Sequence, residues 1–331
     1  MSESISTASL PQNRFFDRLP TETLSQIFND VIQDTLSTQE SRKTHYPTLR
    51  SLCLVSKRFR SFTQPLLLKH VSLAMGTGPK LLESLLENNS KEAIATVENF
   101  HYDEKLTRLI PLLRKFIKVA TNLEQAVVKR QVPPLKAFFG SNITTLSLFA
   151  VTMTLNGAVF AFPQLVRLTM TGCPIHNEGG IRFELPKLKH LAWFNHSTSL
   201  WPQEFDFINR LAPQLDSFMA YLSGVQFVPD LNRVKNLYFE VRRRLPDATM
   251  WIELIGNSNQ HGNSNQHQLE TVTLAQLQGW ELDSDSLGEI EGLEGVCKRN
   301  GIEVIWEEKG NGDTFYDRVP ASFIHRVESR R

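Results

Sequence analysis

The stretch Phe162-Pro163-Gln164-Leu165-Val166-Arg167-Leu168-Thr169-Met170 contains the pattern that decides the fold. A proline-containing lead is followed by the order apolar-x-x-apolar-x-apolar, in which Leu165, Leu168 and Met170 are the apolar residues. The lead occurs again as Leu185-Pro186-Lys187-Leu188 and as Ala212-Pro213-Gln214-Leu215. The alternation at the end of each unit predicts a short strand with one face buried.

The apolar triplet recurs along most of the chain after Gly76. From Leu123 onward, its first positions are 20, 22, 23, 27, 19, 35 and 33 residues apart. A unit of this length cannot bury its apolar face alone, so neighbouring units must stack. We expect a parallel sheet with one strand per unit, and helices such as 246–256 and 286–298 in the longer connections. The triplets are Val97/Phe100/Tyr102, Leu123/Ala126/Val128, Ile143/Leu146/Leu148, Leu165/Leu168/Met170, Leu188/Leu191/Trp193, Leu215/Phe218/Ala220, Val234/Leu237/Phe239 and Leu269/Val272/Leu274, and a final alternating strand follows at Ile302, Val304 and Trp306.

Composition excludes several classes of protein. The chain has 331 residues, a formal net charge of +1, 41% hydrophobic residues and 21% charged residues. These values exclude a collagenous or wholly disordered chain and give no reason to expect nucleic-acid binding. The three cysteines, Cys53, Cys173 and Cys297, are too few and too widely spaced for a disulfide framework or a paired-cysteine metal site. Residues 1–13 are polar and predict a disordered leader rather than a signal peptide. We expect no membrane span, and a cytoplasmic or nuclear location, or both.

The two ends of the chain differ in charge. Residues 41–75 contain seven basic residues and no acidic one, whereas residues 281–308 contain nine acidic residues and two basic ones. This segregation predicts different partners for the two ends, although two solvated faces would produce the same pattern.

The N-terminal part has helical rather than strand periodicity. Leu19-Pro20-Thr21-Glu22 places a proline beside a helix start, and apolar residues at 24, 27, 28 and 31 follow at helical spacing. After a polar insert at 37–45, residues 49, 52, 55 and 59 form a second apolar stripe, and 70–73 alternate like a strand. The pattern predicts a small helical domain that leads into strands.

This region resembles an F-box. The residues that carry the resemblance are 19–28, with Leu-Pro-x-Glu at their start, and 49–60, which include Leu54-Val55-Ser56-Lys57-Arg58-Phe59. The resemblance covers about residues 14–73 and implies a three-helix domain that docks on an acidic Skp-type adaptor, and through it on a cullin scaffold. The same residues are also candidates for the internal core of the domain. The positions that match the family's docking residues are Leu19, Pro20, Leu24, Ile27, Phe28, Leu52, Val55 and Phe59.

The later units loosely resemble leucine-rich repeats, so the chain is similar to fungal-type F-box proteins with divergent repeats. The expected fold is α/β: a three-helix F-box at 14–73, then a curved leucine-rich-repeat-like solenoid with a parallel sheet at 74–308. A flexible insert at 256–268 contains the tandem hexapeptide GNSNQH, and 309–331 form a C-terminal tail. The resemblance implies the substrate-recognition subunit of a Skp–cullin–F-box ubiquitin ligase. An adaptor-bound F-box scaffold that acts outside a ligase is the alternative.

The expected substrate surface comes from strand residues between the apolar positions, because these point away from the core. Phe194, Tyr221 and Tyr238 are the expected anchors for an unknown protein substrate, with Arg167 and His190 beside them. We identify no catalytic constellation, metal-ligand spacing or cofactor motif in the sequence, and expect a protein that is not an enzyme.

Overall fold

The structure is a computed structural model. It describes residues 19–36, 50–73, 78–102, 110–129, 138, 141–151, 153–154, 159–176, 182–194, 202–221, 233–241, 248–257, 269–277, 282 and 284–309. The chain divides into two compact units, Met1–Leu67 and Leu68–Arg331. The strand 70–73, which the F-box resemblance assigned to the first domain, therefore lies in the second unit.

The first unit is helical. It contains α1 (Thr21–Leu36), a helical segment at residues 50–55, and α3 (Lys57–Leu68). The second apolar stripe of the sequence predicted one helix through residue 59, and this is wrong: the helix is interrupted at Ser56. The Ser56 Oγ accepts a hydrogen bond from the backbone N–H of Phe59 at 3.1 Å, as the N-cap of α3 does.

A small core holds these helices together. Leu24 and Phe59 are buried, and Leu19, Leu52, Phe62 and Leu66 pack against them.

Polar contacts join the same segments. The Arg58 Nη2 donates to the Leu19 carbonyl at 2.5 Å, which ties the start of α1 to α3. The Arg60 Nε donates to the Cys53 carbonyl at 3.1 Å, and the Cys53 thiol lies 2.9 Å from the buried Thr63 hydroxyl.

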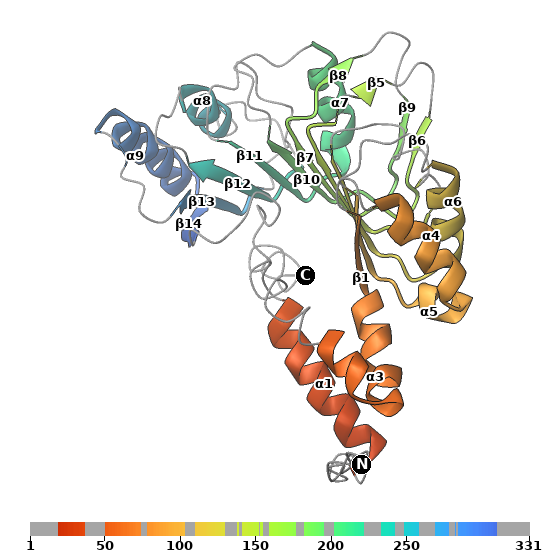
Figure 1. Ribbon diagram of the computed structural model, residues 1–331. Coiled ribbons are helices and arrows are strands. Elements are labelled where there is room, and N and C mark those ends of the chain that lie inside the picture. The colour runs from red at the N-terminus through yellow and green to blue at the C-terminus, as the bar shows by residue number, and fades with distance from the viewer. Residues whose placement is uncertain are drawn as a thin grey trace, which may run out of the picture. The chain divides into compact units, whose positions relative to one another are not determined.

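The second unit is built on a ten-stranded parallel sheet in the order β1-β2-β3-β4-β7-β10-β11-β12-β13-β14 (Figure 1). Each strand pairs with the strand of the following unit, as the repeat predicted. The strands are β1 (His70–Leu73), β2 (Asn99–Tyr102), β3 (Gln125–Lys129), β4 (Thr145–Phe149), β7 (Arg167–Thr171), β10 (His190–Phe194), β11 (Ser217–Tyr221), β12 (Asn236–Val241), β13 (Thr271–Leu277) and β14 (Glu303–Lys309).

The proline-containing lead before β7, β10 and β11 forms a turn whose first and last side chains are both buried. The backbone N–H of Leu165 donates to the Phe162 carbonyl, and Leu188 and Leu215 make the same bond three residues back, at 3.1–3.2 Å. The first and last residues of each lead are buried. The lead therefore places one apolar residue before the turn and one after it into the core.

A backbone hydrogen-bond pattern also recurs just before most strands: two consecutive N–H groups donate to one carbonyl of the preceding unit. The N–H groups of Lys189 and His190 both donate to the Val166 carbonyl, and those of Asp216 and Ser217 both donate to the Lys189 carbonyl. The pattern starts at the Lys69 carbonyl and continues through most of the sheet. At three of these positions an ion pair also joins neighbouring units. The pairs are Lys69–Glu98 (2.8 Å), Lys189–Asp216 (3.9 Å) and Lys235–Glu270 (3.3 Å). These side chains are partly exposed, so each pair contributes little to stability.

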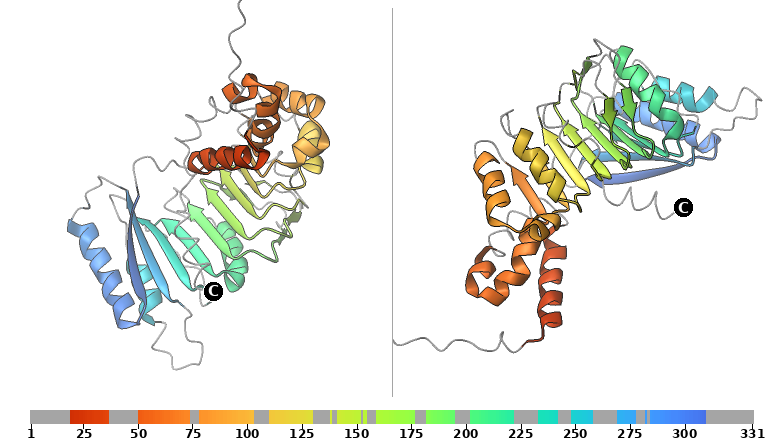
Figure 2. Two further views of the ribbon diagram at one scale, coloured as in Figure 1. Left: turned by 90° about the horizontal axis from the view of Figure 1, so that it is seen from below. Right: turned by 90° about the vertical axis from the view of Figure 1, so that its right-hand side faces the viewer.

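The connections depend on unit length. The two short units between β4 and β10 are linked through the small parallel pairs β5 (Met153–Thr154) with β8 (Ile175–His176) and β6 (Val159–Ala161) with β9 (Arg182–Glu184). The other connections contain helices, several of which line one face of the sheet (Figures 1 and 2). These are α4 (Gly78–Asn88), α5 (Lys91–Ala95), α6 (Ile110–Val119), α7 (Pro202–Leu211) with the 3₁₀ turn Ala212–Gln214, α8 (Thr249–Asn257) and α9 (Ser284–Arg299).

The apolar triplets form one continuous core with these helices. We call the side of the sheet that they occupy the core face. Most triplet residues are buried, and Trp251 of α8 and Leu293 of α9 belong to the same cluster. Leu269 and Val304 are partly buried, and Trp306 is 43% exposed because β14 is the edge strand. The Trp306 Nε1 donates to the Glu294 Oε1 at 2.6 Å.

The remaining boundary predictions have mixed outcomes. The predicted insert begins inside α8, which extends to Asn257, so only residues 258–268 fall outside the described residues. The predicted leader at 1–13 and the tail beyond Lys309 also lie outside them.

Candidate functional site

The first unit exposes apolar side chains beside its small core. Ile27 of α1 is 44% exposed, Leu54 is 79% exposed and Val55 is 65% exposed. These three residues, which we call the apolar surface, are the residues of this unit that gain most from a partner. Burial of an aliphatic side chain contributes about 1.5–3 kcal/mol.

The eight predicted docking residues separate into two groups. Leu24 and Phe59 are buried and, with the partly buried Leu19 and Leu52, form the core of the unit. They therefore stabilise the helices, and a docking role for any of the four stays a prediction. Pro20, Ile27 and Val55 are exposed, and the Phe28 side chain lies outside the described side chains.

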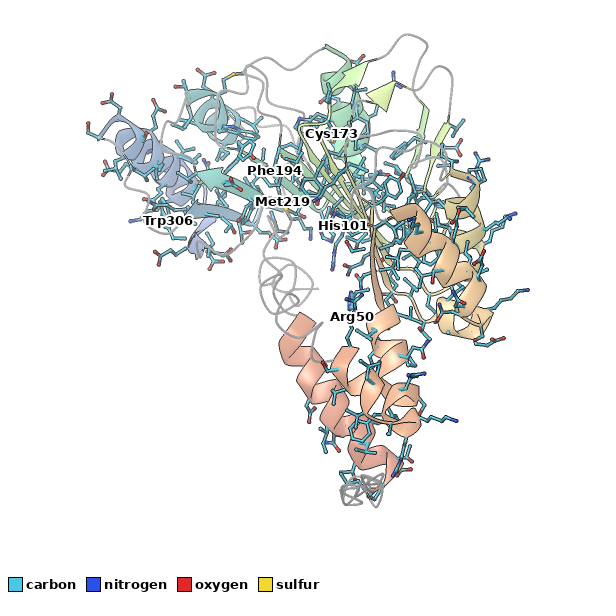
Figure 3. The ribbon with its side chains drawn as sticks, viewed as in Figure 1. Arg50, His101, Cys173, Phe194, Met219 and Trp306 are labelled. Carbon is cyan, nitrogen blue, oxygen red and sulfur yellow. The ribbon has the colours of Figure 1, made fainter. Side chains whose placement is uncertain are left out.

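The sheet has a second face, opposite the core face, which we call the outer face. Its residues alternate with the core triplets, for example Arg167, Thr169 and Thr171 on β7. Strand pairing aligns them in rows across the sheet, so that Ala192 lies beside Thr169 on one side and Met219 on the other. Figure 3 marks His101, Phe194 and Met219 on these strands.

The five predicted substrate contacts all lie on the outer face, but four of them are buried. His190 is 3% exposed, Phe194 0%, Tyr221 3% and Tyr238 0%. The expectation that they are available to a partner is therefore wrong. Phe194 and Tyr221 are in ring contact, with centroids 5.0 Å apart, and belong to a cluster separate from the main core. Only Arg167 is partly exposed.

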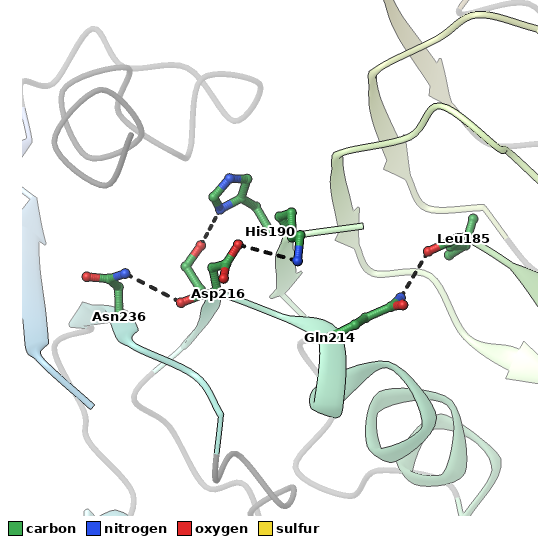
Figure 4. A network of polar contacts seen from close by, with 7 residues as sticks. Leu185, His190, Gln214, Asp216 and Asn236 are labelled. Carbon is green, nitrogen blue, oxygen red and sulfur yellow. Dashed lines mark hydrogen bonds and ion pairs between the residues drawn. The ribbon is translucent and has the colours of Figure 1, made fainter. Parts of the chain in front are cut away.

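Polar side chains form a row along the strand starts of the outer face. The His190 Nδ1 lies 2.6 Å from the Ser217 Oγ, and the Thr271 hydroxyl donates to the Asn236 Oδ1 at 2.8 Å. The Asn236 side-chain amide donates to the Asp216 carbonyl at 3.4 Å, next to the Lys189–Asp216 ion pair (Figure 4). His190 is therefore part of a structural hydrogen-bond row rather than an exposed contact.

Two of the three thiols of the chain are buried, those of Cys173 and Cys297. Burial, reinforced by the nearby Glu294, raises the pKa of the Cys297 thiol to about 11. At neutral pH this thiol is protonated and unreactive. Within the described ranges, no group of three or more His, Cys, Asp or Glu side chains could hold a metal ion. In the same ranges, no helix is long and apolar enough to cross a membrane.

The sequence reasoning missed one residue of the apolar surface. Leu54 lies off the stripe formed by residues 49, 52, 55 and 59, so its periodicity gave no sign of a role. The signal that could have found it is adjacency: Leu54 and Val55 are consecutive apolar residues in a short helical segment, where both cannot face a small core.

Comparisons with known proteins complete the description of the site. A scan against protein-family models, a search of curated proteins and a search of solved structures each found no match.

Proposed function

We propose that the chain is the substrate-recognition subunit of a Skp–cullin–F-box ubiquitin ligase. In this proposal the first unit is a three-helix F-box that docks on a Skp-type adaptor, and the second unit is a leucine-rich-repeat-like solenoid that recruits a protein substrate. The ligase chemistry belongs to other subunits.

The observation that carries the proposal is the apolar surface. Ile27, Leu54 and Val55 are exposed on helices whose internal contacts are made by other residues. Exposed aliphatic residues on a small helical unit favour a protein partner. The sequence around Leu54 and Val55 contains basic residues and no acidic one between positions 41 and 75, which suits an acidic adaptor.

The second unit supports the recruitment role. One parallel strand per unit, paired in sequence order, is the arrangement of stacked repeats. On the outer face, Val127, Ser147, Arg167 and Thr169 keep part of their exposure. We assign the substrate surface to these strands, β3, β4 and β7, in place of the buried aromatic residues first expected.

Adaptor binding by the purified full-length chain tests the docking role. The double substitution Leu54→Asp with Val55→Asp places two charges in the proposed contact and should weaken binding by at least about a hundredfold. Gln26→Asp, an exposed polar position one residue before Ile27, is the matched control and should change binding less than about threefold. Circular dichroism should show that all variants retain their helices. Unchanged binding by the double variant would exclude this docking surface.

Assembly with a cullin separates the proposal from the scaffold alternative. The ligase role requires one complex that contains the chain, the adaptor and the cullin, and ubiquitin transfer to a captured protein that depends on the chain. A chain that binds free adaptor but never adaptor bound to cullin would support the scaffold alternative instead.

A further inference from the structure

The two edge strands of the sheet differ in length. β1 (His70–Leu73) has four residues, of which two are buried. β14 (Glu303–Lys309) has seven residues, and each pairs in unbroken register with β13. Among the described strands, none lies on the other side of β14 (Figure 2). Edge strands that avoid pairing with other chains are usually short, bulged or interrupted by proline, and β14 has none of these features.

The side of β14 that faces away from β13, which we call the β14 edge, presents backbone groups at regular intervals. In a parallel ladder, consecutive residues direct their N–H and C=O groups alternately to the two sides of the strand. The Glu303 N–H donates to the Glu270 carbonyl at 3.1 Å, so Glu303 and every second residue after it face β13. The residues between them, Val304, Trp306 and Glu308, therefore direct their N–H and C=O groups to the β14 edge.

Trp306 supplies an aromatic surface at this edge. Its side chain is 43% exposed (Figure 3). Its Nε1 donates to the Glu294 Oε1 of α9 at 2.6 Å, which positions the ring while part of its surface stays accessible. Leu287, which is 46% exposed, lies about two turns from Glu294 on the same face of α9. A positioned tryptophan loses little conformational entropy on binding and is a frequent anchor in protein interfaces.

Acidic side chains accompany the β14 edge. Glu303 and Glu308 are exposed on β14. Glu291 is exposed on α9, three residues before Glu294 and thus on the helix face that contacts Trp306. Residues 281–308 contain nine acidic residues and two basic ones, and the basic pair lies in the last turn of α9. The local charge therefore favours a basic partner.

We propose that the β14 edge binds an extended, basic segment of a partner protein, which adds to the sheet as a further strand. Main-chain hydrogen bonds to Val304, Trp306 and Glu308 hold the segment in register. Its lysine or arginine side chains approach the exposed carboxylates of β14 and α9, and an apolar side chain packs against the Trp306 ring.

Charge selects this partner over a second copy of the chain. Two β14 edges side by side would bring Glu303 and Glu308 of both copies close together, and like charges on adjacent strands destabilise their pairing. A basic segment meets the same carboxylates with the opposite charge. Strands β10 to β13 separate the β14 edge from β7 in the sheet order. Binding here is therefore an interaction beyond the substrate surface proposed on β3, β4 and β7, and it does not depend on adaptor docking.

Peptide binding to the purified full-length chain tests the proposal. The probe is a fluorescein-labelled peptide of alternating lysine and valine, long enough to span the seven residues of β14, and fluorescence anisotropy measures its dissociation constant. In a second peptide glutamate replaces lysine, and in a third every peptide nitrogen is methylated, which removes the backbone donors. Each of these two should bind at least about tenfold more weakly than the probe. Absence of probe binding, or equal binding of either altered peptide, would overturn the proposal.

Variants of the chain locate the binding and separate backbone pairing from charge. Glu308→Pro removes a carboxylate and an N–H of the β14 edge, whereas the matched Glu308→Ala removes the carboxylate alone. The proline variant should weaken probe binding at least about tenfold and the alanine variant about two- to fivefold. Trp306→Ala should weaken it at least about tenfold. Glu253→Ala, which removes an exposed carboxylate of α8, should change it less than about twofold.

Equal binding by the two Glu308 variants would exclude strand addition at this edge. Thermal unfolding checks that each variant folds, and the comparison of the three peptides stays decisive if one does not, because it uses the unaltered chain. Size-exclusion chromatography tests the competing occupant: a dimer of the unaltered chain that Glu308→Pro dissociates would assign the β14 edge to a second copy and overturn the proposal.

Discussion

The two halves of the outer face share one backbone arrangement and differ in how many of their side chains remain accessible. Over β2 to β7 several outer-face residues, such as His101, Ser147 and Thr169, are partly exposed, whereas Lys129, Phe149 and Thr171 at the strand ends are buried. Over β10 to β13 the outer face is aromatic and buried, with Phe194 and Tyr238 fully inaccessible. Position in the repeat therefore determines which way a side chain points, but not whether solvent or a partner can reach it.

The largest expected effect is a difference in unfolding free energy between alanine variants of the two halves of the outer face. Phe194→Ala should lower the free energy of unfolding by about 3–5 kcal/mol, because it leaves a cavity in a fully buried cluster. Thr169→Ala, at a partly exposed outer-face position on the neighbouring strand, should change it by less than about 0.5 kcal/mol. Urea unfolding of both variants measures the difference. Similar losses in the two variants would contradict the division of the face.

A smaller effect is expected from two histidine–serine pairs in adjacent strands. His190→Ala removes the partner of Ser217 at a buried site and should cost about 1–3 kcal/mol of unfolding free energy. His101→Ala removes an exposed contact to Ser72 at 3.2 Å and should cost less than about 0.5 kcal/mol.

A double-mutant cycle isolates the buried pair. His190→Ala, Ser217→Ala and the combined variant should give a coupling energy of at least about 0.5 kcal/mol. Additive losses would show that His190 stabilises the sheet through other contacts.

The smallest effect concerns the turn that follows a strand in the half over β2 to β7. Ala150 and Gly172 occupy equivalent positions after β4 and β7, with φ of 50° and 57°. Their N–H groups donate to the Thr171 and Phe194 carbonyls respectively. A left-handed conformation costs a non-glycine residue about 1–2 kcal/mol, part of which glycine returns through the entropy of the unfolded chain. Ala150→Gly should therefore raise the unfolding free energy by about 0.5–1 kcal/mol, and Gly172→Ala should lower it by about 1 kcal/mol. Thermal unfolding of the two single variants checks the sign, and equal signs would contradict the equivalence of the turns.

Periodicity predicted the parallel sheet because an alternating strand in a stacked repeat must bury the same positions in every unit. The strands and the late helices lie within a few residues of where the pattern placed them. The exposed Trp306 departs from the pattern because β14 is the edge strand of the described sheet. In the first unit, the stripe through residues 49 to 59 ignored Ser56, whose hydroxyl starts a new helix.

The candidate surfaces were less predictable. Leu24 and Val55 both occupy apolar positions at helical spacing, yet the first is 1% exposed and the second 65%. The spacing of apolar residues along a helix predicts which residues favour burial, but a unit with so small a core cannot bury all of them. The residues left over form the proposed docking surface.

The sequence by itself determined the repeating strand, the face on which each strand residue lies and the helical character of the first unit, because these follow from local periodicity. Only the tertiary structure decided which of those residues remain accessible. Phe194, Tyr221 and Tyr238 point away from the core as alternation requires, yet they are buried. Accessibility depends on what segments distant in the sequence cover, and no local pattern contains that information.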